Sequence, residues 1–173
     1  MDKVITKESG SANDSSTMSF QCIDAIEISL FIEKEGLGFY EKAAKNVSEP
    51  RVKDIFLRLT EEEREHIHIL ETKLQFLKPA ISGKGKTRRK VDLYIKDELT
   101  DKIFPASENN LVNKFTNDLE ALEYGIECEK RSIKVLNNLL FNEKKLDVKS
   151  IFAHLVVEEK KHLALLEELR AKI

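Results

Sequence analysis

The 173-residue sequence is poor in several residue types, and each shortage excludes a class of protein. It has no tryptophan, six glycines and three prolines, so it fits neither a collagen-like repeat nor a low-complexity chain. Its two cysteines, Cys22 and Cys128, are isolated. Without a Cys-x-x-Cys pair the chain has no thiolate site for iron or structural zinc, and we expect both thiols to be reduced and buried.

Long apolar stretches and an excess of one charge are also missing. No window of about 18 apolar residues occurs, so we expect no membrane-spanning helix. The first residues, MDKVITKESGSANDSST, lack the apolar core of a secretory signal, which predicts a cytoplasmic protein. The formal net charge is only −2, which favours neither nucleic acid nor a membrane surface as a partner. The length suits one domain with its own core.

The sequence does contain an internal repeat. Residues 55–66, IFLRLTEEEREH, match residues 151–162, IFAHLVVEEKKH, at an offset of 96 (151 minus 55), and each copy ends in Glu-x-x-His. The same offset relates residues 33–40, EKEGLGFY, to residues 129–136, EKRSIKVL. Each half therefore carries a lone glutamate followed at the same interval by a Glu-x-x-His motif: Glu33, Glu63 and His66, then Glu129, Glu159 and His162.

Apolar residues recur at three- and four-residue steps through both halves, which indicates helices. Helices are predicted over about 19–46, 49–77, 117–142 and 148–171, with Asn117 and Asp147 as caps of the last two. Residues 1–18 are predicted to be a disordered tail. Residues 79–116 are predicted to be a crossover linker, with a loop at the basic run 84–90 and a short helix over 91–99. The expected fold of residues 19–173 is an all-α four-helix bundle of two antiparallel pairs.

The repeated glutamates and histidines are predicted to meet in one layer of that bundle. Each glutamate lies about 14 residues from the turn of its helix pair, and each histidine lies one helical turn beyond on the same face. Buried carboxylates need counter-charge, and no lysine or arginine lies on the inward faces to supply it. Two divalent cations would supply it. A buried polar network or a looser bundle with these glutamates at its rim is the alternative.

The residue types narrow the choice of metal. Carboxylate-rich sites with one histidine per metal favour iron, with manganese as the alternative, over zinc. Helical phase excludes three similar residues from the site, because Glu65, His68 and His154 fall outside the apolar stripes. These three are predicted to be exposed.

A glutamate from each of two helices with Glu-x-x-His from each of the other two resembles the di-iron carboxylate pattern of ferritin-like bundles. Within that pattern, EKEGLGFYEKAA at residues 33–44 and the leucine four residues after His66 are similar to rubrerythrin-related proteins. The resemblance implies that Glu63 and Glu159 bridge two iron ions, that Tyr40 is a catalytic tyrosine beside them, and that Glu62 and Glu158 orient the imidazoles. It assigns as iron ligands Glu33, Glu63, His66, Glu129, Glu159 and His162.

The resemblance also implies a function in oxidative stress. It predicts an oxidoreductase that reduces hydrogen peroxide or O2, acts as a homodimer and, lacking the cysteine-based rubredoxin module, takes electrons from an external donor such as a rubredoxin. Two other functions stay open: ferroxidation for iron storage, and a non-catalytic helical bundle whose basic run 84–90 contacts an anionic partner. Tyr40 has its own alternative as a core aromatic residue, since Leu136 is its equivalent in the repeat.

Overall fold

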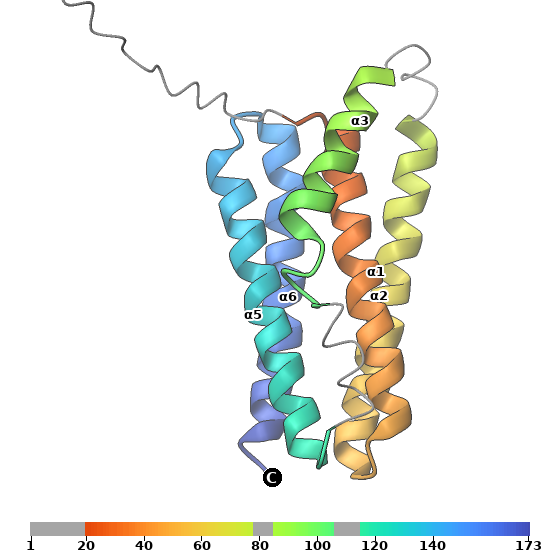
Figure 1. Cartoon of the computed structure of the whole chain (residues 1–173), viewed down its shortest axis with the longest axis vertical. Helices are drawn as coiled ribbons and strands as arrows, with labels where there is room; N and C mark the ends of the chain where they lie inside the picture. Colours follow the sequence, from red (N-terminus) through yellow and green to blue (C-terminus); the bar gives the residue numbers. More distant parts are fainter. Residues whose placement is uncertain (1–19, 78–84, 106–114) are drawn as a thin grey trace, which may run out of the picture.

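In the computed structural model, residues 20–77, 85–105 and 115–173 are described, and they form an all-α bundle. The four long helices are α1 (Cys22–Asn46), α2 (Pro50–Leu77), α5 (Asp118–Asn142) and α6 (Leu146–Arg170). They lie side by side along the long axis of the molecule (Figure 1). The shorter α3 (Gly85–Tyr94) is followed directly by a π-helical segment, η2 (Ile95–Leu99). The predicted ferritin-like four-helix bundle is confirmed.

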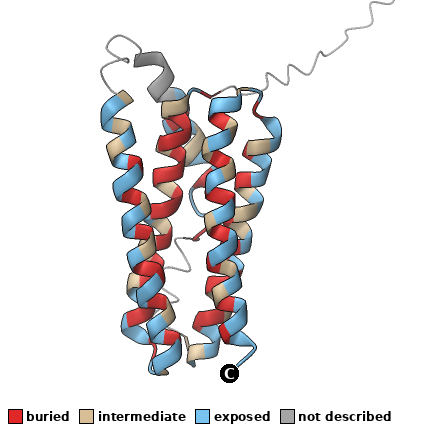
Figure 2. Ribbon diagram, turned by 180° about the vertical axis from the view of Figure 1, so that it is seen from behind, coloured by how far each residue is buried: buried red, intermediate tan, exposed pale blue. Residues whose placement is uncertain are grey.

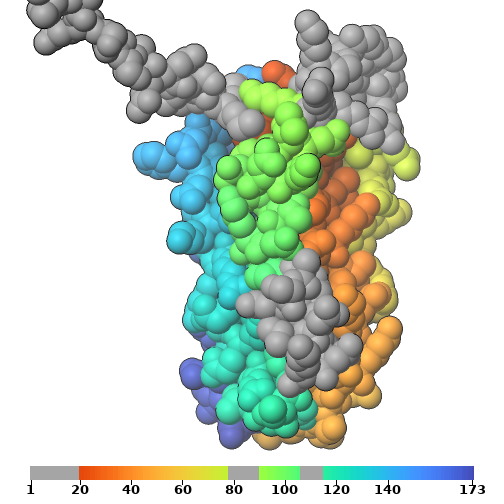
Figure 3. Space-filling view, viewed as in Figure 1, coloured from red at the N-terminus to blue at the C-terminus, as the bar shows by residue number. Residues whose placement is uncertain are grey.

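The helices form two antiparallel pairs, α1 with α2 and α5 with α6, and α6 also contacts α1 and α2. Because α2 and α5 run in the same direction, the chain must return along the bundle between them (Figure 1). The described part of this crossover lies on the face between α1 and α5 (Figure 3). It adds Leu99, Ile103 and Phe104 to the buried core. The long linker therefore covers part of the core as well as connecting the two pairs.

Buried residues line the inward faces of all four long helices, and exposed residues cover the outside (Figure 2). Aromatic rings fill the core beside the repeated glutamates: the ring centroids of Phe39 and Phe56 are 6.0 Å apart, and those of Phe39 and Phe104 are 5.8 Å apart. Phe56 and its repeat equivalent Phe152 are both fully buried. The two halves thus use equivalent positions to build one core. Among the described residues, no helix is long and apolar enough to span a membrane.

The predicted ends of the four long helices are correct to within three residues, but one of the two predicted caps is wrong. The backbone N–H of Glu120 donates to the side chain of Asn117 at 2.9 Å, which confirms that cap. Asp147 does not cap α6, because the helix already begins at Leu146 with Lys145 as its N-cap. The Asp147 carboxylate instead accepts hydrogen bonds from the N–H of Val148 and from the thiol of Cys22, both at 3.0 Å.

Two further expectations are wrong in part. Within the basic run 84–90, residues 85–90 do not form a loop, because α3 begins at Gly85; residue 84 lies outside the described residues. One glycine at a helix start does not outweigh the helix-forming lysines and arginines after it. Cys128 is buried as expected, whereas Cys22 is only half-buried. The predicted tail, residues 1–18, lies outside the described residues.

Candidate metal centre

The structure brings all six repeated residues together at the middle of the bundle. Glu33 comes from α1 and Glu129 from α5, while α2 and α6 each supply a Glu-x-x-His motif. Their ligand atoms form two groups in which one atom from each residue lies within 4.8 Å of the others. We call these six residues the carboxylate–histidine cluster; its two groups are Glu63, Glu129, Glu159 and His162, and Glu33, Glu63 and His66.

One ring nitrogen of His162 faces three carboxylates. Its Nδ1 lies 3.3 Å from Oε1 of Glu63, 3.5 Å from Oε2 of Glu159 and 3.7 Å from Oε1 of Glu129. All four residues are buried, and the His162 side chain is 1% exposed. This half of the cluster is therefore enclosed.

His66 occupies the equivalent place in the other half. Its Nδ1 lies 3.3 Å from Oε2 of Glu33 and 3.9 Å from Oε2 of Glu63. The His66 and His162 rings stack with centroids 5.7 Å apart. Glu63 thus contacts both imidazoles and belongs to both groups, as a bridging carboxylate would. Glu159, which the resemblance also implied as bridging, belongs only to the group of His162.

The glutamates that precede the two motifs contact the imidazoles crosswise. Oε2 of Glu62, on α2, lies 3.3 Å from Nε2 of His162, on α6. Oε2 of Glu158, on α6, lies 3.9 Å from Nε2 of His66, on α2. A carboxylate behind an imidazole fixes the ring and the nitrogen that stays deprotonated. Here the carboxylate beside each histidine comes from a different helix pair than the histidine itself.

Two hydroxyl groups hold the carboxylates of the enclosed half. The Tyr40 hydroxyl donates to Oε1 of Glu129, and the Ser132 hydroxyl donates to Oε1 of Glu159 at 2.6 Å. Tyr40 is fully buried against the Phe39 and Phe56 rings. Tyr40 was predicted from the sequence, whereas Ser132 was not. Its position three residues after Glu129, on the inward face of α5, was the available signal.

Burial and mutual repulsion perturb the acidic groups of the cluster. Burial, and then the adjacent Glu33, raise the pKa of Glu63 well above its ordinary value. Burial, and then Glu159, do the same to the pKa of Glu129. Burial also works against ionisation of Glu159, yet the adjacent His162 and Glu129 hold its pKa below the ordinary value. Without metal, Glu63 and Glu129 therefore bind their protons more tightly than free glutamates do.

The imidazoles respond to the same carboxylates. Burial alone would lower the pKa of His162, but Glu159 and Glu129 outweigh it and raise that pKa to about 9. The hydrogen bond with Glu33 raises the pKa of His66. Burial, followed by the charge of Glu129, raises the pKa of Tyr40 well above 10, so Tyr40 is a hydrogen-bond donor at neutral pH.

The residues fit a pair of divalent cations. Among the described side chains, Oε2 of Glu63, Oε2 of Glu129 and Nδ1 of His162 are buried without a hydrogen-bond partner. Each such atom costs about 1–3 kcal/mol unless it is bound to something. These three belong to one cluster of four carboxylates and two imidazoles, whose charge two divalent cations would balance.

The two halves of the cluster differ in how far they are open to the protein surface. The His66 side chain is 18% exposed, and a surface cavity of about 570 Å³ between α2 and α6 is lined by His66, Glu62 and Glu158 among others. A smaller cavity of about 20 Å³ touches Glu33 and His66. The cluster therefore opens to the surface at His66. Glu65, His68 and His154 are exposed, as predicted.

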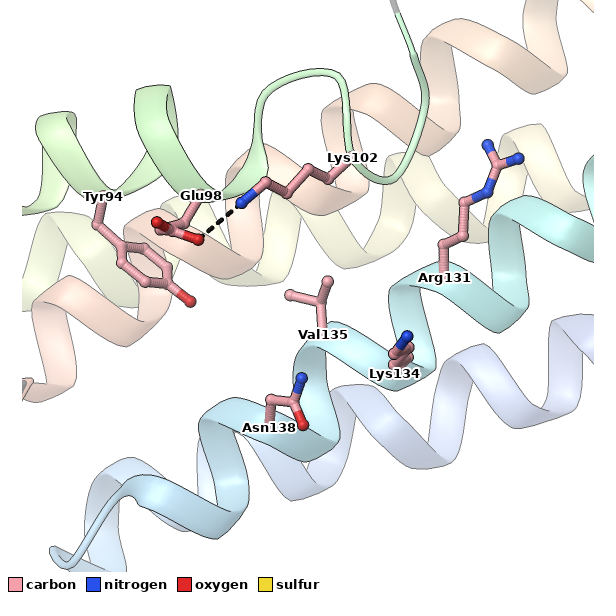
Figure 4. A pocket seen from close by; sticks show the side chains of 7 residues that line it. All are labelled: Tyr94, Glu98, Lys102, Arg131, Lys134, Val135 and Asn138. Carbon is pink, nitrogen blue, oxygen red and sulfur yellow. Dashed lines mark hydrogen bonds and ion pairs between the residues drawn. The ribbon is translucent and has the colours of Figure 1, made fainter.

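Another cavity, of about 380 Å³, lies between the crossover and α5 (Figure 4). Lys102, Arg131 and Lys134 border it together with Glu98, which pairs with Lys102 at 2.7 Å. Tyr94, Val135 and Asn138 complete its lining. None of these residues belongs to the carboxylate–histidine cluster.

Comparison with known proteins places the chain in a family. The sequence model of the family Rubrerythrin matches residues 24–170, a range that includes the whole cluster and Tyr40. The chain belongs to the rubrerythrin family. No curated protein matches this family member significantly.

One solved structure is similar to this rubrerythrin-family chain. It is a two-domain protein from Anabaena variabilis that contains DJ-1/ThiJ/PfpI-like and ferritin-like domains. The TM-score is 0.60 with 19% sequence identity, over 87% of this chain and 39% of that protein. The similarity shows the fold alone, and the chain spans well under half of that protein.

Proposed function

We propose that this rubrerythrin-family chain is a di-iron oxidoreductase that reduces hydrogen peroxide or O2. The observation that supports it best is the arrangement of the cluster, in which Glu63 lies between two ligand groups and each group has one inward-facing imidazole nitrogen. When bound, two ferrous ions would supply one electron each and polarise the oxygen substrate. Two electrons and two protons convert one H2O2 into two H2O.

In this proposal the chain's own residues bind the metal ions and orient the side chains that hold them. The six cluster residues hold the metal pair, Glu62 and Glu158 fix the imidazoles, and Tyr40 holds Glu129 in position. The aromatic rings around Tyr40 exclude water from the enclosed half. The cavities beside His66 give substrate its approach. An external electron donor such as a rubredoxin, a homodimer and a cytoplasmic location belong to the same proposal.

Metal content and reaction with peroxide test this function. Protein loaded with iron under nitrogen is expected to hold about two ions per chain and to consume about one H2O2 per pair, as the two-electron balance requires. Protein loaded with zinc, which is redox-inert, is the control and should consume none. A chain that takes up no iron would contradict the proposal. Faster reaction with O2 than with peroxide, with the ferric product retained, would instead favour ferroxidation for iron storage.

Replacing Tyr40 with phenylalanine separates its two interpretations. Phenylalanine keeps the ring but removes the hydrogen bond to Glu129, so we expect unchanged iron content and a roughly tenfold slower reaction with peroxide, the value of one hydrogen bond to a charged group. Tyr124→Phe is the matched control, because that ring packs on Phe39 at 5.2 Å in the same aromatic core. Equal rates in wild type and Tyr40→Phe would leave Tyr40 a core aromatic only.

A further inference from the structure

The internal repeat allows the two halves of the cluster to be compared position by position. Ser132 and Gly36 are equivalent, since both lie three residues after the lone glutamate of their half. Ser132 donates a hydrogen bond of 2.6 Å to Glu159. Gly36 offers no side chain, and a Cβ built there would lie 3.0 Å from Oε1 and 3.4 Å from Cδ of Glu63. One half therefore hydrogen-bonds its motif glutamate from this position, while in the other half the motif glutamate lies directly against a residue without a side chain.

Tyr40 and Leu136 are a second pair of equivalent positions, and again only one of the two side chains carries a hydroxyl group. Tyr40 donates a hydrogen bond to Glu129, whereas its equivalent, Leu136, has no donor to offer Glu33. The enclosed half is thus held by two hydroxyl donors, which form strong hydrogen bonds with carboxylates. The half that opens at His66 has glycine and leucine at the same places.

Gly36 is buried near the middle of α1, where glycine weakens a helix. Its surroundings supply a reason for glycine. The Glu63 carboxylate lies against it, and the ring of Phe104 would lie 3.7 Å from an added Cβ. Any side chain at position 36 would press on the carboxylate that belongs to both ligand groups. Gly38, two residues on, has no such neighbour, because a Cβ there would meet nothing within 4 Å.

We propose that Ser132 and Gly36 are positioning residues that determine which motif glutamate can move. Ser132 holds Glu159 in one arrangement through its hydroxyl group, whereas Gly36 has no side chain that could hold Glu63. This inference rests on the proposed function only in that a carboxylate between two metal ions must adapt when their occupancy or charge changes. Movement is then confined to the motif glutamate that both ligand groups share.

Crystal structures of the whole chain, stripped of metal and loaded with redox-inert Mn²⁺ under nitrogen, test the proposal. In the wild type, Glu63 is expected to change rotamer between the two forms and Glu159 to keep its rotamer. Gly36→Ser should hold Glu63 in one rotamer, and Ser132→Gly should release Glu159. The double variant, with Gly36→Ser and Ser132→Gly, should keep Glu63 in one rotamer and let Glu159 change its rotamer instead. Gly38→Ser is the matched control for serine in α1 and should behave as wild type.

Binding measurements give a second readout that does not depend on activity. Loss of the Ser132 hydrogen bond should weaken Mn²⁺ binding about tenfold, the value of one hydrogen bond to a charged group, in both Ser132→Gly and the helix-favouring Ser132→Ala. A fixed Glu63, or a mobile Glu159, in the wild type would overturn the inference even if two ions bind and peroxide is consumed. Normal carboxylate movement with two ions bound but no reaction with peroxide would overturn only the proposed function. A chain that binds neither Mn²⁺ nor Fe²⁺ would overturn both.

Discussion

Alanine at Glu63 is expected to remove both metal ions, whereas alanine at Glu33 is expected to remove only one. Glu63 is the residue that the two ligand groups share, so its loss leaves Glu33 with His66 in one group and three residues in the other. The Glu33→Ala variant keeps Glu63, Glu129, Glu159 and His162 intact. Elemental analysis of protein reconstituted with Fe²⁺ or Mn²⁺ under nitrogen would measure the ions bound per chain.

Glu65→Ala is the matched control for this pair of variants. Glu65 lies on α2 two residues after Glu63, but it is exposed and outside both ligand groups. This variant should therefore bind two ions per chain. If Glu63→Ala retained one tightly bound ion while Glu33→Ala lost both, the assignment of Glu63 as the shared ligand would be wrong.

The sequence predicted the cluster because helical periodicity fixes both burial and direction. A residue on an apolar stripe must face the core, and two copies of one pattern at equal distances from their turns must face each other. Glu33, Glu63, Glu129 and Glu159 were therefore predicted to lie in one layer, with each histidine one helical turn beyond. Helical periodicity also separated His66 from His68, which lies on the same helix but is exposed.

The differences between the halves could not be predicted in the same way. The repeat makes Gly36 and Ser132 equivalent, and only the distances to Glu63 and Glu159 show that one lies against its glutamate without a side chain while the other donates a hydrogen bond. The crosswise contacts of Glu62 and Glu158 depend on how α2 packs against α6, which periodicity does not specify. The loop predicted for the basic run was wrong for a local reason. The helix-forming residues after Gly85 outweighed the glycine, so α3 begins there.

Metal is expected to change how the stability of the protein depends on pH. In the protein stripped of metal, the pKa values of Glu63 and Glu129 are raised by burial, and that of His162 rises from 6.5 to about 9. The folded chain thus binds these protons more tightly than the unfolded chain. The stabilisation is complete below the unfolded pKa values and is lost as pH rises through the folded ones. For His162 alone, the rise to about 9 corresponds to about 3 kcal/mol of unfolding free energy.

The melting temperature of the stripped protein should therefore fall between about pH 5 and pH 9, the window set by these pKa values. The lowered pKa of Glu159 acts at more acidic pH and does not offset this fall. Metal binds the deprotonated ligands, so the gain in melting temperature on adding Mn²⁺ should grow with pH. Calorimetry of both forms measures this, with His162→Gln expected to flatten the fall and His68→Gln, at an exposed position, to leave it unchanged. A stripped protein that became more stable from pH 5 to 9 would show that the cluster does not hold these protons, and its carboxylates would then need another counter-charge than metal.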